Sequence, residues 1–148
     1  ARFILALRHP CDVLLSCFMS NFRLNDAMAN FLRLEDAAAF YDLTFQHWER
    51  ARALFGLDVH TIVYERLVED VEAGVRPLFD FLGLEWHDEA LDHRATAKAR
   101  GLITTASYAQ VVEPIYKRAA GRWEGYRAHL EPILPVLRPW VEKFGYSL

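Results

Sequence analysis

Arg8 and Ser16, near the start of the chain, have the types and spacing of an anion site. Arg8 follows the apolar run Phe3–Leu7, Asp12 comes four residues later, and Ser16 comes eight residues later. In open α/β sheets, ligands bind beyond the carboxyl ends of the strands, where the N-termini of helices also point. The guanidinium fork of Arg8 suits a phosphate, and a helix here lets Ser16 share a face with Asp12. In the alternative interpretation, Arg8 pairs with Asp12 and Ser16 bonds a helix carbonyl.

Two short strands are the elements that must position these residues. Arg2–Leu7 is a short apolar run, and it predicts a strand buried on both faces. Val59–Tyr64 is rich in β-branched residues and predicts the second strand. Because helices separate the two, we expect an α/β fold with short parallel strands. Two strands alone make a poor sheet, so the pattern indicates part of a larger domain.

The spacing of apolar residues predicts a helix-rich chain around these strands. The expected helices are one from about Cys11, a short one over Asn25–Leu32, Glu35–Phe55, Glu65–Asp70, Val71–Leu82, a short one after Asp88, and one from Pro114 to about Leu130. Pro132, Pro135 and Pro139 should break the last helical stretch into short or kinked pieces. Gly56, Gly83 and Gly145 each stand between apolar residues at a predicted helix end, where a left-handed glycine stops the helix.

The clearest helix, Glu35–Phe55, carries one apolar stripe at steps of three and four residues. Its members are Ala37, Tyr41, Phe45, Trp48, Arg52 and Phe55. We expect this stripe to pack in the core.

Composition restricts the class of protein. The chain has 148 residues, 53% of them apolar, which fits one folded domain over residues 1–148. The net charge of −3 gives no reason to expect a nucleic-acid partner, so an anion site must be local. No apolar run approaches the ~20 residues needed to span a bilayer. There is no signal peptide, and the start at Ala1, directly before a predicted strand, favours a fragment of a cytoplasmic protein.

The cysteines and histidines predict neither a disulfide nor a metal site. Cys11 and Cys17 lie six residues apart on one predicted helix, where they are poorly placed to pair. We interpret them as thiols of a reducing cytosol. The six histidines are scattered without zinc-type spacing, so no metal is expected.

Three segments, taken together, carry a resemblance to a known family. The segment LRHPCDVLLSCF resembles the 3′-phosphate-binding segment of sulfotransferases that use 3′-phosphoadenosine 5′-phosphosulfate (PAPS). Arg8 and Ser16 match the two phosphate-binding positions. The segment TIVYERLVED is similar to the family's second strand end, where Tyr64 matches a tyrosine that contacts adenine. The segment YKRAAGRWEGY resembles the C-terminal block of bacterial members, including those linked to tetratricopeptide repeats.

That last segment implies a basic closure over the phosphate. In the family, a basic loop just before Gly-X-Trp closes over the 3′-phosphate, and Lys117 and Arg118 precede Gly121 here. Which of the two cations reaches the phosphate stays open. The resemblance implies a helix-rich, partial P-loop NTPase-like fold, with PAPS or 3′,5′-adenosine bisphosphate (PAP) as cofactor and a hydroxyl or amine as acceptor.

No P-loop occurs in these residues, and the resemblance puts that loop and the catalytic base upstream of Ala1. We therefore assign no catalytic residue. His9 is rejected as the base because it adjoins the 3′-phosphate, on the wrong side of the cofactor. The expected partners are PAPS and a small-molecule or macromolecular acceptor, and the surface left by the missing part could support a homo-oligomer.

Two other functions stay open at this point. The chain could be a catalytically inactive helical interaction module that retains the family packing. It could also be another nucleotide-utilising α/β enzyme, such as a kinase relative, which would prefer ATP over a 3′-phosphorylated nucleotide.

Overall fold

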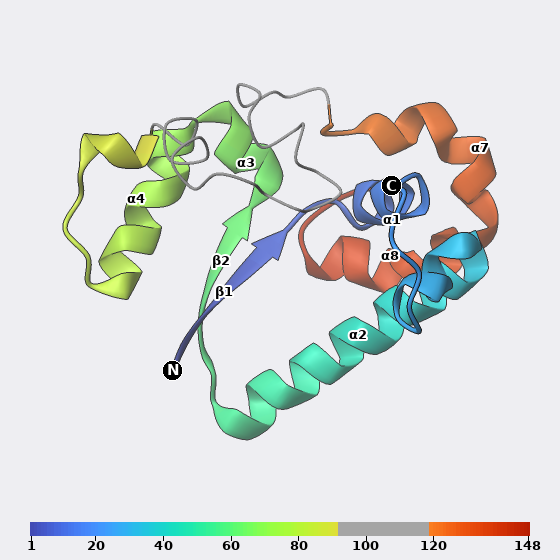
Figure 1. Ribbon diagram of the computed structural model, residues 1–148, viewed down its shortest axis with the longest axis horizontal. Coiled ribbons are helices and arrows are strands. Elements are labelled where there is room, and N and C mark those ends of the chain that lie inside the picture. Colours follow the sequence, from blue (N-terminus) through green and yellow to red (C-terminus); the bar gives the residue numbers. More distant parts are fainter. Residues whose placement is uncertain (92–118) are drawn as a thin grey trace.

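The computed structural model describes residues 1–91 and 119–148, and these residues form a helix-rich α/β fold around one short parallel sheet (Figure 1). The strands are β1, Arg2–Leu7, and β2, Asp58–Val63. They pair in parallel from Arg2 opposite Asp58 to Leu7 opposite Val63. Both predicted strands are confirmed, although the second ends one residue early, because Tyr64 already begins a helix. This register brings the two carboxyl ends level with each other.

The prediction that Arg2–Leu7 is buried on both faces is wrong. Phe3 is 37% exposed and Ile4 is 49% exposed, and only Leu7, at the carboxyl end, belongs to the core. The reason is that the sheet has two strands among the described residues, and the core lies among helices beside its carboxyl end. The apolar run was therefore a correct signal for a strand and a wrong signal for burial.

Three helices, packed against one another, enclose the core. They are α1, Pro10–Phe18; α2, Leu34–Phe55; and α8, Leu134–Lys143. Figure 1 shows α1 and α8 on one side of the strands, with α2 running diagonally beneath them. The buried cluster comprises Cys11, Leu14, Leu15, Ala37, Ala38, Tyr41, Trp123, Leu130, Ile133, Leu134, Leu137 and Trp140. Burial of this apolar surface is the main stabilising contribution, and it fixes α1 as a rigid support for the site.

The apolar stripe on α2 is only half inside this core. Ala37 and Tyr41 are buried and Phe45 packs against the cluster, as expected. Phe55, at the other end, is 70% exposed, so the prediction is wrong there. In Figure 1 the C-terminal half of α2 runs away from α1 and α8, which leaves its last turns without a helix to pack against among the described residues.

The remaining elements complete the described chain. In order, they are the 3₁₀ helix η1, Met28–Leu32; α3, Tyr64–Glu69; α4, Val71–Leu82; η2, Asp88–Leu91; η3, Arg122–Tyr126; α7, Arg127–Leu130; and η4, Glu131–Ile133. α3 and α4 pack against β2, on the opposite side from α1 (Figure 1). Gly56, Gly83 and Gly145 all have positive φ, which confirms the three predicted helix stops. Within the described residues, no helix is both long and apolar enough to cross a membrane.

The helix predicted from Pro114 to Leu130 differs from the structure. Residues 114–118 lie outside the described part, and the chain is not one helix beyond them. Gly121 is left-handed, with φ +69°, and separate helices η3 and α7 follow it. Pro132 lies in η4 and Pro135 in the first turn of α8, so the predicted break into pieces is confirmed. Pro139, by contrast, lies inside α8 without ending it.

Candidate functional site

Arg8 and Tyr64 lie side by side because each follows the last paired residue of its strand. Leu7 pairs with Val63, so the next residue on each strand leaves the sheet at the same level. The Arg8 guanidinium carbon lies 5.0 Å from the centroid of the Tyr64 ring, within cation–π range. Two of the five residues predicted to bind the nucleotide are therefore neighbours at the carboxyl edge of the sheet.

The Arg8 guanidinium is only partly occupied by protein contacts. One terminal nitrogen donates to the Ala119 carbonyl and lies 3.9 Å from the Asp12 carboxylate. The ion pair with Asp12 that the alternative interpretation expects is present, while phosphate binding by Arg8 stays a prediction. Its Nε is buried, yet it has no hydrogen-bond partner within the described residues. A buried donor without an acceptor costs about 1–3 kcal/mol, so this nitrogen favours an additional acceptor.

Asp12 is the best-connected polar side chain of this region, and only its place at the start of the helix could be predicted from the sequence. As expected, it lies in the first turn of α1, where a negative charge is favoured. Its side chain is also fully buried, and its two oxygens accept from the backbone amides of Gly121 and Trp123, both at 2.8 Å. An aspartate after His-Pro among apolar residues was the available signal, but its partners lie more than a hundred residues away.

The His9 side chain caps the N-terminus of α1 and packs against neighbouring residues. Its Nδ1 accepts from the amide of Cys11 at 3.2 Å, and Pro10 takes the first helical position. Because Nδ1 accepts, the proton of a neutral ring lies on Nε2, which donates to the Ser147 carbonyl at 3.0 Å. The ring also stacks on Trp123, with centroids 4.9 Å apart. His9 thus has a structural explanation, consistent with its rejection as the catalytic base.

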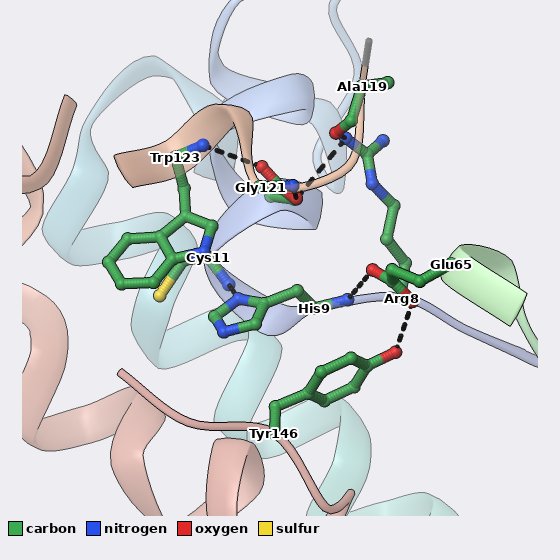
Figure 2. A network of polar contacts seen from close by, with 9 residues as sticks. Arg8, His9, Cys11, Glu65, Ala119, Gly121, Trp123 and Tyr146 are labelled. Atoms are coloured by element: carbon green, nitrogen blue, oxygen red, sulfur yellow. Dashed lines mark hydrogen bonds and ion pairs between the residues drawn. The ribbon is translucent and has the colours of Figure 1, made fainter. Parts of the chain in front are cut away.

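Glu65 joins the two strand ends to the C-terminus, as Figure 2 shows. Its Oε1 accepts from the His9 amide at 2.9 Å, and its Oε2 accepts from the Tyr146 hydroxyl at 2.6 Å. Burial, followed by the bond to Glu65, raises the pKa of the Tyr146 phenol. The first-turn position of Glu65 in α3 was expected, but the contact with Tyr146 was not visible in the sequence.

Ser16 lies in the second half of α1 and is half-buried. The hydroxyl that bonds a helix carbonyl there is that of Ser20, which donates to the Ser16 carbonyl at 2.7 Å. Next to Ser16, burial raises the pKa of the Cys17 thiol and the Arg8 charge partly offsets the rise. The joint binding of a phosphate by Arg8 and Ser16 stays a prediction.

Lys117 and Arg118, the remaining predicted contacts, lie outside the described residues. The first described residue after them is Ala119, whose carbonyl accepts from Arg8. The segment that follows the predicted basic pair in sequence is thus in direct contact with the predicted phosphate residue (Figure 2).

Neither cysteine forms a disulfide; Cys11 is buried and Cys17 half-buried. Burial, and then the neighbouring Asp12 charge, raise the pKa of the Cys11 thiol to about 12, so it is protonated at neutral pH. Across residues 1–91 and 119–148, no group of three or more His, Cys, Asp or Glu side chains is arranged to hold a metal.

Two relatives align over most of this chain. An uncharacterized protein of Aquifex aeolicus (strain VF5) is 29% identical over 151 aligned residues, which cover 97% of this chain and 18% of that protein. A segment of the cytoplasmic dynein heavy chain of Eremothecium gossypii is 31% identical over 119 residues, covering 80% of this chain and 3% of that protein. The chain therefore spans less than a fifth of the length of either relative.

The family comparison matches the part of the chain that holds Arg8, Asp12, Ser16 and Tyr64. The model of the sulfotransferase family matches residues 1–88, more than half of the 148 residues. This match begins at β1 and continues past α4, so it covers both strands and the sheet edge where Arg8 meets Tyr64. The chain belongs to the sulfotransferase family.

Proposed function

We propose that this chain binds the 3′-phosphoadenosine end of PAPS, or of the product PAP, within a sulfotransferase that transfers a sulfuryl group to a hydroxyl or amine. The observation that carries the proposal is Arg8. Its guanidinium lies beside the carboxyl ends of both strands, which the register brings to the same level. Its buried Nε has no acceptor among the described residues. The Arg8 side chain is 20% exposed, so a phosphate can reach its open side, and Arg is the side chain best suited to a phosphate.

The nearby carboxylates are compatible with a bound anion. Asp12 is compensated by two backbone amides and by Arg8 itself. Glu65 accepts from a backbone amide and a phenol, one on each oxygen. Because both negative charges are engaged by donors, they repel a phosphate less than free carboxylates would. The charges of these residues therefore fit a bound phosphate group.

Each remaining residue has a role in the proposal. The Tyr64 ring would contact the adenine, and the Ser16 hydroxyl would donate to the 3′-phosphate beside Arg8. Lys117 or Arg118 would close over the same phosphate. When bound, PAPS supplies the sulfuryl group, and these side chains bind and orient its nucleotide end. They neutralise charge and abstract no proton, so the catalytic base and the P-loop are assigned to other residues of the full-length protein.

Calorimetric titration of the full-length protein with PAP and with 5′-AMP tests the site. Arg8→Ala should weaken PAP binding by roughly 10- to 150-fold, the range of a lost charge-assisted hydrogen bond, and should leave 5′-AMP nearly unchanged. Arg8→Lys keeps a positive charge beside Asp12 but loses the fork, so an intermediate loss is expected. Arg50→Ala, an exposed arginine of α2, is the matched control.

The same titration, extended to ATP, separates the other functions. Equal PAP affinity in the wild type and Arg8→Ala would refute the site. Preference for ATP over PAP would favour a kinase-like enzyme, and binding of neither nucleotide would favour an interaction module.

A further inference from the structure

The buried carboxylate of Asp12 is the feature that the proposed nucleotide contacts do not use. Its side chain has no exposed surface, although aspartate is rarely buried without strong partners. The partners are two backbone amides of one short segment, Gly121 and Trp123, each 2.8 Å from a different carboxylate oxygen. Both oxygens are thereby committed to the segment that follows the predicted basic pair.

Gly121 gives that segment the shape the carboxylate requires. It is left-handed, with φ +69°, and immediately precedes η3, and the amides of Gly121 and Trp123 both reach one carboxylate. Trp123 is 3% exposed and stacks on His9, which fixes the far end of the segment. The near end is fixed by the Ala119 carbonyl, which accepts from Arg8.

Arg8 and Asp12 therefore hold the same segment from both sides. Arg8 lies 3.9 Å from Asp12, and both side chains contact residues 119–123. Figure 2 shows the Arg8 side chain against Ala119. A shift of the segment would break contacts of both side chains, so the position of the guanidinium is coupled to the position of the segment. The pair is buried on the Asp12 side, where water screens the interaction least.

We infer that Asp12 is a positioning residue of the phosphate site: it fixes the Arg8 guanidinium and the segment 119–123 relative to each other, so that 3′-phosphate affinity depends on its carboxylate. This inference rests on the proposed function, because the affinity in question is that of the 3′-phosphorylated nucleotide. Asp12 itself touches no ligand.

The substitution Asp12→Asn tests the charge and the second acceptor with almost no change in volume. The amide group of asparagine keeps one acceptor oxygen and puts an NH₂ donor against the other backbone amide. One of the two bonds to Gly121 or Trp123 must therefore be lost, along with the ion pair to Arg8. Asp58→Asn is the matched control, since Asp58 also pairs with an arginine, Arg2, but its side chain is 61% exposed.

We expect Asp12→Asn in the full-length protein to weaken PAP by about tenfold, within the usual range of coupling between linked groups, while 5′-AMP affinity stays within twofold. The ratio of the two affinities is the decisive readout, because a general loss of structure would lower both. Gly121→Ala is the second variant, for use if Asp12→Asn does not fold. A Cβ in the left-handed conformation strains the segment, and it should lower the same ratio.

Equal loss for PAP and 5′-AMP, or no loss, would overturn the inference. A wild-type protein that does not prefer PAP over 5′-AMP would instead overturn the proposed function. In that case hydrogen exchange still decides whether Asp12 fixes the segment: exchange of the Gly121 and Trp123 amides should accelerate in Asp12→Asn and remain slow in Asp58→Asn. Unchanged exchange would refute the positioning role.

Discussion

Removing one hydroxyl, in Tyr146→Phe, should measure how firmly the C-terminus is held to the strand ends. The Tyr146 hydroxyl donates to Glu65 Oε2 at 2.6 Å, while Oε1 of the same carboxylate accepts from the His9 amide at 2.9 Å. A hydrogen bond to a charged group contributes about 1.5–3 kcal/mol, and the remaining carboxylate oxygen is left partly buried without its donor. We therefore expect the free energy of unfolding to fall by about 2 kcal/mol.

Urea denaturation at pH 7, followed by tryptophan fluorescence, measures this change, and the control is Tyr126→Phe. Tyr126 is also half-buried and lies against His129 and Arg122, but no hydrogen bond of its hydroxyl is found in the described part of the chain. We expect its loss to stay within about 0.5 kcal/mol. Equal midpoints for the two variants would refute the contribution assigned to Glu65.

Alkaline pH gives a second, independent check on the same bond. The pKa of Tyr146 is raised in the folded protein, first by burial and then by Glu65. Its stabilising contribution is therefore complete below the ordinary tyrosine value of about 10, and it declines as the pH rises further, because the unfolded chain ionises first. The stability difference between the wild type and Tyr146→Phe should accordingly shrink above that pH. A difference that grows would contradict the raised pKa.

Two further outcomes are expected. Asp42→Ala should lower the free energy of unfolding by about 1–3 kcal/mol, because the Trp140 indole N–H, 2.8 Å from the Asp42 carboxylate, loses its acceptor between α2 and α8. Chemical denaturation measures this loss, with Asp36→Ala, at an exposed carboxylate of the same helix, as the control. Equal stability of the two variants would refute the prediction. Cys11 is buried and has a pKa of about 12, so it should react with a thiol reagent at pH 8 only when the protein unfolds, while half-buried Cys17 should react slowly in the folded protein. Mass spectrometry after timed labelling distinguishes the two thiols. Faster labelling of Cys11 than of Cys17 would contradict the burial of Cys11.

The features that could be predicted from the sequence are those set by neighbouring residues. The two strands, the long helix ending at Phe55 and the left-handed glycines at 56, 83 and 145 depend on local periodicity and backbone sterics. The meeting of Arg8 and Tyr64 could also be predicted, since parallel strands bring their carboxyl ends to one edge. This prediction follows from the strand geometry alone.

The features that could not be predicted depend on contacts between distant parts of the chain. The exposure of Phe3 and Phe55 was missed because periodicity identifies an apolar face but does not show what covers it. The helix predicted across Gly121 was wrong because the preferred partner of its amide is Asp12, 109 positions away, and no local pattern records that bond. Helix propensity is weak enough for such a buried, charged acceptor to override it.

These distant contacts bear directly on the proposed chemistry. Arg8, His9 and Asp12 are close in sequence, yet they bind three different places: the Ala119 carbonyl, the Ser147 carbonyl and the amides at Gly121 and Trp123. A phosphate site assembled from local residues alone would tolerate changes in the last thirty residues of the chain. Here those residues hold the turn that presents Arg8. Substitutions at Gly121 or Tyr146 should therefore change the position of the residues at the strand ends. The nucleotide affinity of variants at Gly121 and Tyr146 therefore tests whether the last thirty residues hold the phosphate site in place.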